Sequence, residues 1–223
     1  MNPTLPLLIP RFYRGFSPSL KEKSVSIVAG PAVDSVIRNE IPYSHPLRLV
    51  ARKFGFDIEN LNLMNTIEVK GKKVTFRIAD IGREAMNLIS LPVLKEHKIC
   101  KLSCVLENQL GFLSLKDKFM LYVRLRDFHR TIAEVNLILR PKISFVDAIE
   151  VMVGAQERRR GGKSKFLGYM IAGEDPVSLD SFCLELMKEL SPKLAELRPE
   201  DIRYLRLAEE MGIGTTKYEA IEI

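Results

Sequence analysis

Short β-branched or apolar runs alternate with segments of helical periodicity along this chain, and this alternation constrains its fold most strongly. The pattern predicts strands at 24–29, at 67–78 (a hairpin about Gly71-Lys72), within 83–94, at 143–146 and at 166–172. It predicts helices at 46–54, 121–139, 178–190 and 202–211. Strands that alternate with helices are typical of α/β domains. We therefore predict a single α/β domain over residues 24–223, with a mostly parallel sheet, flanking helices and a β-hairpin insertion. An irregular, proline-rich arm at residues 1–23 precedes it.

The composition excludes several other classes of protein. Of 223 residues, 46% are hydrophobic and 28% are charged, and the mean hydropathy is 0.00, as in globular chains rather than membrane or disordered ones. No apolar run approaches the roughly 18 residues that a spanning helix needs, and the N-terminus lacks the basic start and cleavage site of a signal peptide. Three cysteines, an odd number, favour a reducing compartment. We therefore expect a cytoplasmic protein.

The formal net charge of +6 is concentrated in one segment. Residues 156–165 carry a balance of +4, which leaves only +2 for the rest of the chain. The charged residues of this segment are Arg158, Arg159, Arg160, Lys163 and Lys165, with Glu157 as the one acid. Nucleic-acid binders usually show a broad basic face with stacking aromatic residues, which this segment lacks. Two interpretations stay open: a solvent-exposed loop, or a glycine-containing loop whose arginines and backbone amides bind phosphate or carboxylate.

Several chemically useful residues follow predicted strands. Lys95 and His97 follow the strand within 83–94, Asp147 ends the strand at 143–146, and Asp175 follows the strand at 166–172. Ligands of open α/β sheets bind at the carboxyl ends of the strands, so these residues are expected near one another. In an extended segment Lys95 and His97 share one side, where a lysine can hold an anion and a histidine can transfer a proton. The alternative is a polar surface turn.

Three further residues are candidates for a site. Asn108 could orient a ligand and Gly111 could let the backbone approach one, although both are also ordinary turn residues. His129 lies in the sequence RLRDFHR, which fits either an acid–base group or an exposed, charged helix face.

The cysteines and the nucleotide-binding motifs give mainly negative information. Cys100, Cys104 and Cys183 are too few for a cysteine-only zinc or iron–sulfur cluster in one chain, and we interpret them as buried thiols. His97 and His129 with a carboxylate have suitable types for a metal site, but no short spacing supports one, so the metal and the cofactor stay unassigned. The chain has no GxxxxGK[ST] loop, no GxGxxG after a strand and no GxSxG motif. These absences count against a P-loop ATPase, a Rossmann dehydrogenase and an α/β-hydrolase.

Taken together, these segments resemble one known family. In chain order they are Lys95-x-His97 within SLPVLKEHKICKLSCVLENQLGFL, Asn108 and Gly111, His129, Asp147 in SFVDAIEVMVG, Gly161-Gly162, and DPVSLD at 175–180. This ordered set covers about half of the chain and resembles an uncharacterised prokaryotic family catalogued as domain of unknown function 362, DUF362. The chain resembles a short member, without part of an additional strand–helix unit at the start.

The resemblance implies an α/β fold and a shared polar cleft, but no established reaction. As candidate catalytic residues it implies Lys95, His97 and His129, and as candidate ligand-binding residues Asn108, Gly111, Asp147, Asp175 and Asp180. The charge of the basic segment adds Arg158, Arg159 and Arg160 as candidate ligand-binding residues. This chain departs from the family pattern in two ways. Glu107 stands where the family commonly has a lysine, and the chain has no ferredoxin-type cysteine repeats, so an electron-transfer role is not implied.

Two functions follow from these observations. The first is an enzyme or binder with a polar cleft for a small anionic metabolite: Lys95 and an arginine of 158–160 hold the anion, His97 or His129 acts as acid or base, and Asp147 orients a histidine. The second is a non-catalytic module that binds nucleic acid or an acidic protein through residues 158–165. We prefer the first, because its residues come from several segments. No membrane partner is expected, and the oligomeric state is left open.

Overall fold

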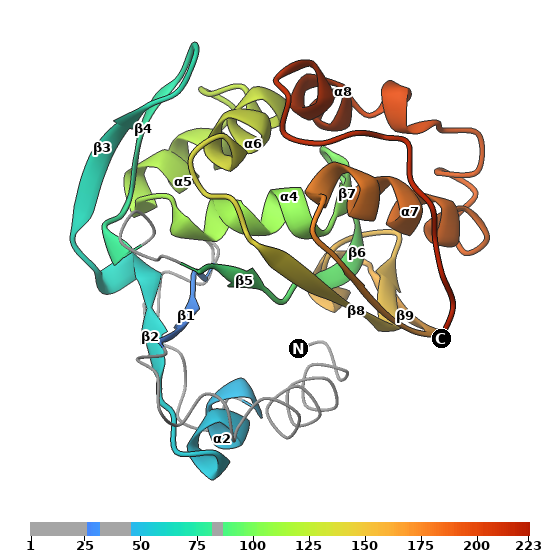
Figure 1. Cartoon of the computed structure of the whole chain (residues 1–223), viewed down its shortest axis with the longest axis horizontal. Coiled ribbons are helices and arrows are strands. Elements are labelled where there is room, and N and C mark those ends of the chain that lie inside the picture. Colours follow the sequence, from blue (N-terminus) through green and yellow to red (C-terminus); the bar gives the residue numbers. More distant parts are fainter. Residues whose placement is uncertain (1–25, 32–45, 82–86) are drawn as a thin grey trace.

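The computed structural model describes residues 26–31, 46–81 and 87–223 (Figure 1). Within these ranges the chain is α/β, as the sequence predicts, with one main sheet, flanking helices and a separate β-hairpin. The arm predicted at 1–23 and the start of the strand predicted at 24–29 lie outside the described residues. That strand is described as β1 (Ile27–Ala29).

A mixed five-stranded sheet lies at the centre of the molecule, and β8 (Ile143–Val153) is its middle strand. β5 (Ile89–Ser90) and β6 (Val93–His97) run parallel to one edge of β8, and β9 (Lys163–Gly173) runs antiparallel along the other. β7 (Lys101–Ser103) completes the sheet as an antiparallel neighbour of β6. The parallel pairing expected between the segments near residues 90 and 145 is therefore present. The sheet is mixed because the chain turns back directly after β6 and after β8, so that β7 and β9 pair antiparallel to them.

β8 and β9 form one long hairpin, which corrects two expectations. The strand predicted at 143–146 continues to Val153, so Asp147 lies within the strand and not at its end. Gly154 (φ 86°) and Gly161 (φ 93°) adopt the left-handed conformation in the connection, which lets the chain reverse. Since β9 runs back along β8, Asp175 follows it at the opposite end of the sheet from this turn. The predicted strand ends therefore do not all meet at one edge.

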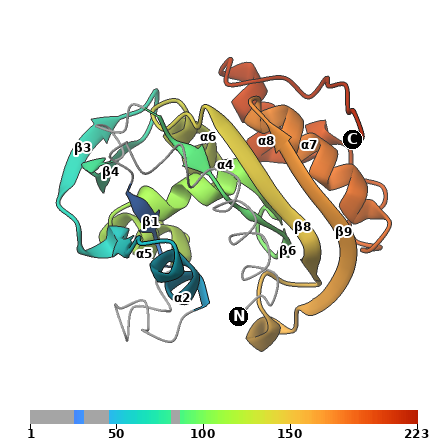
Figure 2. The same cartoon turned by 60° about the horizontal axis from the view of Figure 1, so that its bottom comes forward.

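The helices that follow β7 lie on one side of the main sheet (Figures 1 and 2). Apart from the 3-10 turn η4 (Arg158–Arg160) between β8 and β9, they are α4 (Val105–Asn108), the 3-10 turn η3 (Gln109–Phe112), α5 (Leu115–Tyr122), α6 (Phe128–Asn136), α7 (Pro176–Lys188), η5 (Pro199–Asp201) and α8 (Arg203–Glu210). The helix predicted at 121–139 is in fact interrupted. Arg124 has a φ of 58°, which no α-helix accommodates, and Asp127 caps α6 by accepting the N–H of Arg130 at 3.1 Å. None of the helices in the described ranges is both long enough and apolar enough to cross a membrane.

The N-terminal elements form smaller units beside the main sheet. β1 pairs in parallel with β2 (Ile58–Asn60), and Ala51 of α2 (Pro46–Lys53) packs against Ile58 in a small apolar cluster. The 3-10 turn η2 (Leu61–Leu63) follows β2. The predicted hairpin is confirmed as β3 (Thr66–Lys70) and β4 (Thr75–Ala79). The buried carboxylate of Glu134 in α6 accepts the backbone N–H groups of Lys73 and Val74, which fastens the hairpin tip to the helical layer.

Candidate functional site

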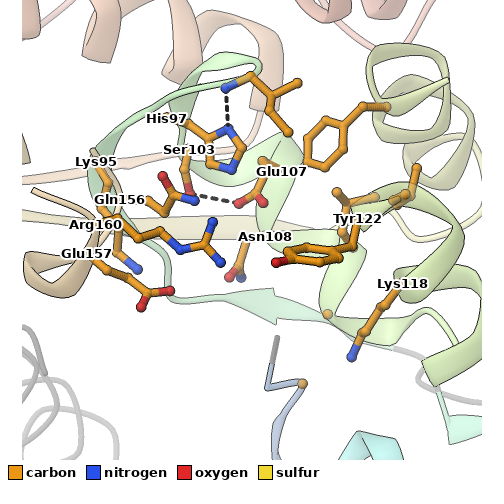
Figure 3. Close-up of a pocket in the computed structure, with 16 residues that line it drawn as sticks. Lys95, His97, Ser103, Glu107, Asn108, Lys118, Tyr122, Gln156, Glu157 and Arg160 are labelled. Carbon is orange, nitrogen blue, oxygen red and sulfur yellow. Dashed lines mark hydrogen bonds between the residues drawn. The ribbon is translucent and has the colours of Figure 1, made fainter. Parts of the chain in front are cut away.

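A cavity of about 330 Å³ opens beside β6, and we call it the β6 cavity (Figure 3). Its polar lining consists of Lys95, His97, Ser103, Glu107, Asn108, Lys118, Tyr122, Gln156, Glu157 and Arg160. Its apolar lining consists of Ile99, Leu110, Leu121 and Phe128, and the glycines Gly30 and Gly111 complete the wall. These residues come from β6, β7 and the turn between them, from α4, η3, α5 and the start of α6, from the turn after β8, and from the residue that follows β1. Side chains that are distant in sequence therefore meet in one place.

The alternation of β6 places Lys95 and His97 in the cavity, as the sequence predicts for an extended segment. Glu96, between them, points to the other face and is buried. Its Oε2 accepts the backbone N–H of Gly154 at 2.7 Å and the hydroxyl of Ser191 at 2.8 Å. The middle residue of this Lys-Glu-His sequence therefore fixes the start of the β8–β9 turn, while its two neighbours face the cavity.

Hydrogen bonds fix the protonation pattern of His97. Its Nδ1 accepts the backbone N–H groups of Ile99 and Cys100, each at 3.2 Å, so Nδ1 carries no proton and the neutral ring bears its proton on Nε2. The ring is 8% exposed and stacks on Phe128 at a centroid distance of 5.5 Å. Burial lowers the pKa of His97, and the nearby charge of Arg160 lowers it further, while Glu107 partly offsets both. His97 is therefore a neutral hydrogen-bond donor through Nε2.

Acidic and amide groups line the cavity on α4 and β7. The hydroxyl of Ser103 donates to Oε2 of Glu107 at 2.7 Å, which orients this carboxylate (Figure 3). The amide nitrogen of Asn108 donates to the hydroxyl of Ser90 at 3.0 Å. This bond uses one of the two N–H groups of the amide and orients it, so its carbonyl oxygen can accept from a ligand and its second N–H can donate to one.

The basic segment divides between the cavity and solvent. Its arginines form the 3-10 turn η4 (Arg158–Arg160); Arg160 lines the cavity, whereas Arg158 and Arg159 are exposed. The ammonium of Lys98 donates to the carbonyl of Arg160 at 2.8 Å and holds the turn against the end of β6. Arg159 forms an ion pair with Glu157. Gln156 also lines the cavity, and its side-chain amide oxygen Oε1 is buried without a hydrogen-bond partner among the described residues.

Lys118 of α5 also lines the cavity, although its sequence does not predict it as a site residue. Its side chain is buried (7% exposed), and its Nζ donates to Oδ1 of Asn62 at 2.5 Å and to the carbonyl of Pro31 at 3.3 Å. Burial lowers the pKa of this amine to about 7. Nothing in the local sequence LKDKF distinguishes Lys118 from the exposed Lys116, because both its burial and its partners depend on segments far away in the chain.

Two glycines bring the chain near Lys118 into place. A Cβ atom at Gly30 would lie 2.0 Å from the carbonyl oxygen of Gly111, so only glycine permits this contact between the end of β1 and η3. Gly111 is the predicted candidate for close backbone approach, and the group that approaches it is the protein's own backbone. The contact sets Gly30 into the cavity wall and the next residue, Pro31, against Lys118.

His129 and Asp147 lie outside the β6 cavity. His129 lines a neighbouring pocket of about 430 Å³ and stacks on Tyr204 at 6.3 Å, and burial lowers its pKa, as does the charge of Arg203. Asp147 is fully buried in β8, where its Oδ1 accepts the N–H of Ile149 at 3.1 Å. Neither residue is among the lining residues of the cavity that contains Lys95 and His97.

The two acids of the DPVSLD motif also lie away from the cavity. Asp175 caps α7 by accepting the N–H groups of Val177 at 2.8 Å and Ser178 at 2.9 Å, and its other oxygen accepts the N–H of Thr215 at 3.0 Å. Asp180 lies in α7 and is completely buried, and its carboxylate accepts the N–H of Val105, the first residue of α4, at 2.7 Å. The contacts of both acids within the described residues are those of helix-cap and core residues.

Among the described residues, no three His, Cys, Asp or Glu side chains lie close enough together to hold a metal ion. Cys104 and Cys183 are buried, and their sulfur atoms lie 3.6 Å apart. As predicted, the three cysteines are buried thiols.

The described residues form a mixed-sheet α/β fold in which a polar cavity is built around a Lys-x-His strand. The family model described as "Domain of unknown function (DUF362)" matches residues 6–185. The chain belongs to this family, as the resemblance in its motifs implies. No curated protein and no solved structure matches the chain.

Proposed function

We propose that the β6 cavity binds a small metabolite that carries a carboxylate. The observation that supports this most strongly is the pairing of Lys95 with His97, a cation and a neutral Nε2–H donor two residues apart on one strand, in the same cavity. Both groups donate to oxygen, and Arg160 adds a second cation to the lining. Lys95 has no hydrogen bond or ion pair to another described residue that would occupy its ammonium.

The shape and lining of the cavity limit the ligand further. A volume of about 330 Å³ lies at the lower end of the range for small-molecule sites and excludes a folded polymer. Leu110, Leu121 and Phe128 supply an apolar wall. A short aliphatic chain with a terminal carboxylate therefore fits better than inorganic phosphate, which has no apolar part.

The hydrogen bonds to His97 favour binding over proton transfer by this residue. A general base would need an unprotonated Nε2, and its proton would then have to move to Nδ1, against two backbone N–H groups. His97 is therefore assigned the role of a donor that orients the carboxylate. His129, in the neighbouring pocket, is left without a role in this proposal.

The proposal is tested by calorimetric titration with butyrate, pentanoate and inorganic phosphate. Replacement of Lys95 by Met should weaken carboxylate binding about ten-fold or more, since a hydrogen bond to a charged group contributes roughly 1.5–3 kcal/mol. Lys165→Met, an exposed β9 position with the same change of charge, is the matched control and should bind like the wild type. Equal affinity of the two variants, or no binding of either carboxylate by the wild type, would contradict the proposal.

A second candidate function is nucleic-acid binding by the β8–β9 hairpin. The observation that favours it is Phe166, which is 75% exposed on β9 next to Lys165 and near Lys163, with Tyr169 also exposed further along the strand. Exposed rings beside cations can stack on bases while the cations contact phosphates. This surface adjoins the basic segment at residues 156–165, for which the sequence leaves a nucleic-acid partner open.

Fluorescence anisotropy with a labelled single-stranded RNA tests this second candidate. The binding constant should fall steeply as salt rises, and Phe166→Ala should weaken binding about five-fold or more at fixed salt. Phe119→Ala, which removes an exposed ring on α5, is the control and should have no effect. Salt-independent binding, or identical affinities of the two variants, would rule the candidate out.

A further inference from the structure

Lys118 is the one lining residue of the β6 cavity whose amine is both buried and without an ion pair among the described residues. The neighbouring Asp117 does not neutralise it. That carboxylate accepts the backbone N–H of Arg77 at 2.9 Å and the hydroxyl of Ser114, and it forms an ion pair with Arg126. A buried ammonium with no counter-charge is unfavourable, so this site favours the neutral amine.

Lys118 makes two hydrogen bonds within the described part of the chain, as many as a neutral amine can donate. A neutral amine has two N–H groups and one lone pair, whereas an ammonium has three N–H groups. Among the described residues the amine has two acceptors, Oδ1 of Asn62 and the carbonyl of Pro31. Asn62 donates through its Nδ2 to the same Pro31 carbonyl at 3.1 Å, which turns its Oδ1 toward Lys118. The two acceptors engage both N–H groups and leave the lone pair available.

We propose that Lys118 is a nucleophile that forms an imine with the carbonyl group of an oxo acid bound in the β6 cavity. The inference rests on the proposed function for the carboxylate end of the ligand and adds the reactive group at the other end. In Figure 3, Lys118 lies on the opposite side of the cavity from Lys95 and His97. With the carboxylate at Lys95, a carbonyl near Lys118 belongs to an oxo acid in which a few carbons separate the two groups.

The chemistry balances without a cofactor. The lone pair of Nζ attacks the carbonyl carbon, a C–N bond forms, and the electron pair of the C=O bond moves to oxygen, which takes up a proton. The nitrogen loses one proton to give the neutral carbinolamine. Its hydroxyl group takes up a proton and leaves as water while the C=N bond forms, and the nitrogen then loses its second proton, so that two protons are taken up and two are released. The net reaction joins amine and carbonyl and releases one water molecule. Nothing is oxidised or reduced.

The state of the amine at neutral pH supports this reactivity. Because burial lowers the pKa of Lys118 to about 7, about half of the amine is neutral at that pH, whereas an exposed lysine is almost entirely protonated. The reaction with a carbonyl compound should therefore increase with pH and reach half its maximum near pH 7.

Reductive trapping tests the proposal. The full chain is incubated with succinic semialdehyde at pH 7.5, cyanoborohydride is added to reduce the imine to a stable secondary amine, and peptide mass spectrometry locates the adduct. Lys118 should be modified at least about ten-fold faster than the exposed lysines, because its neutral fraction is much larger. Lys116→Arg, on the same helix, should leave the adduct unchanged, and Lys118→Arg should abolish it.

The outcomes separate this inference from the proposed function. Even modification of all lysines, or a Lys118 adduct whose rate does not level off near pH 7–8, would overturn the imine proposal; this readout uses the wild-type chain and does not require that a variant folds. Carboxylate binding that depends on Lys95, without any adduct at Lys118, would overturn the imine alone. If Lys118 reacts as fast with uncharged butyraldehyde as with succinic semialdehyde, and Lys95→Met changes neither rate, then Lys118 is a nucleophile, but the proposal that Lys95 binds the carboxylate is contradicted.

Discussion

Lys118 and Asp180 are both buried, and burial moves the pKa of each to about 7, downward for the lysine and upward for the aspartate. Their surroundings nevertheless differ. Lys118 lines an open cavity, whereas Asp180 has no exposed surface and lies among α4, α7 and α8. A pKa near neutrality is therefore not sufficient to identify a reactive group; access to a cavity distinguishes the two.

The hydrogen bonds of Asp180 explain why the sequence retains an acid in the core. Its carboxylate accepts Val105 N–H at 2.7 Å, Leu106 N–H at 3.4 Å and the hydroxyl of Tyr204 at 3.0 Å. The N–H groups of Val105 and Leu106 lie in the first turn of α4, where backbone N–H groups have no acceptor within the helix. Asp180 thus ties α4 to α7 and α8, and α4 carries Glu107 and Asn108 into the cavity wall.

The largest effect is expected from removing this core acid. Asp180→Ala leaves two backbone N–H groups and the Tyr204 hydroxyl buried without their acceptor, and each such group costs about 1–3 kcal/mol. The free energy of unfolding should fall by about 3–5 kcal/mol. Urea denaturation followed by circular dichroism measures this change.

A smaller change in the same network provides the control. Tyr204→Phe removes one donor and leaves the bonds from Val105 and Leu106 in place, so the loss should be about 1 kcal/mol. If Asp180→Ala were no more destabilising than Tyr204→Phe, Asp180 would not be the structural tie described above, and the contrast with Lys118 would lose its basis.

The same contrast shows what the sequence can predict. Local patterns predict the α/β class, the hairpin about Gly71 and the shared side of Lys95 and His97, because these depend on periodicity and turn residues within a few positions. The length of β8 and the direction of β9 are not predicted, since they depend on pairing between the two strands. The sequence-based prediction of a convergent edge was wrong for this reason.

The candidate site is predicted only in part. Lys95, His97, Asn108, Gly111 and Arg160 line one cavity. The other predicted site residues are distributed over the core, the helix caps, a second pocket and the exposed turn. Lys118 escapes prediction because its chemistry arises from partners about 56 and 87 positions away along the chain.

The pH dependence of stability provides a separate test of the contrast between Lys118 and Asp180. The pKa of Lys118 is about 7 in the folded chain and 10.5 as the reference value, so the unfolded chain binds more protons between these values and stability must rise with pH. This contribution is complete above pH 10.5 and is lost as pH falls toward 7. Between pH 7.5 and 9.5 the wild type should gain about 2.5 kcal/mol relative to Lys118→Met, which has no titrating group there. Asp180 contributes little to the change in stability between pH 7.5 and 9.5, because its own change falls mainly between pH 3.8 and 7 and has the opposite sign.

Urea denaturation of the wild type and Lys118→Met at the two pH values gives the difference, and Lys116→Met provides the control for an exposed lysine on the same helix. Parallel pH profiles of the wild type and Lys118→Met would show that the amine remains charged in the folded chain, and the feature that separates Lys118 from an ordinary buried cation would then be absent.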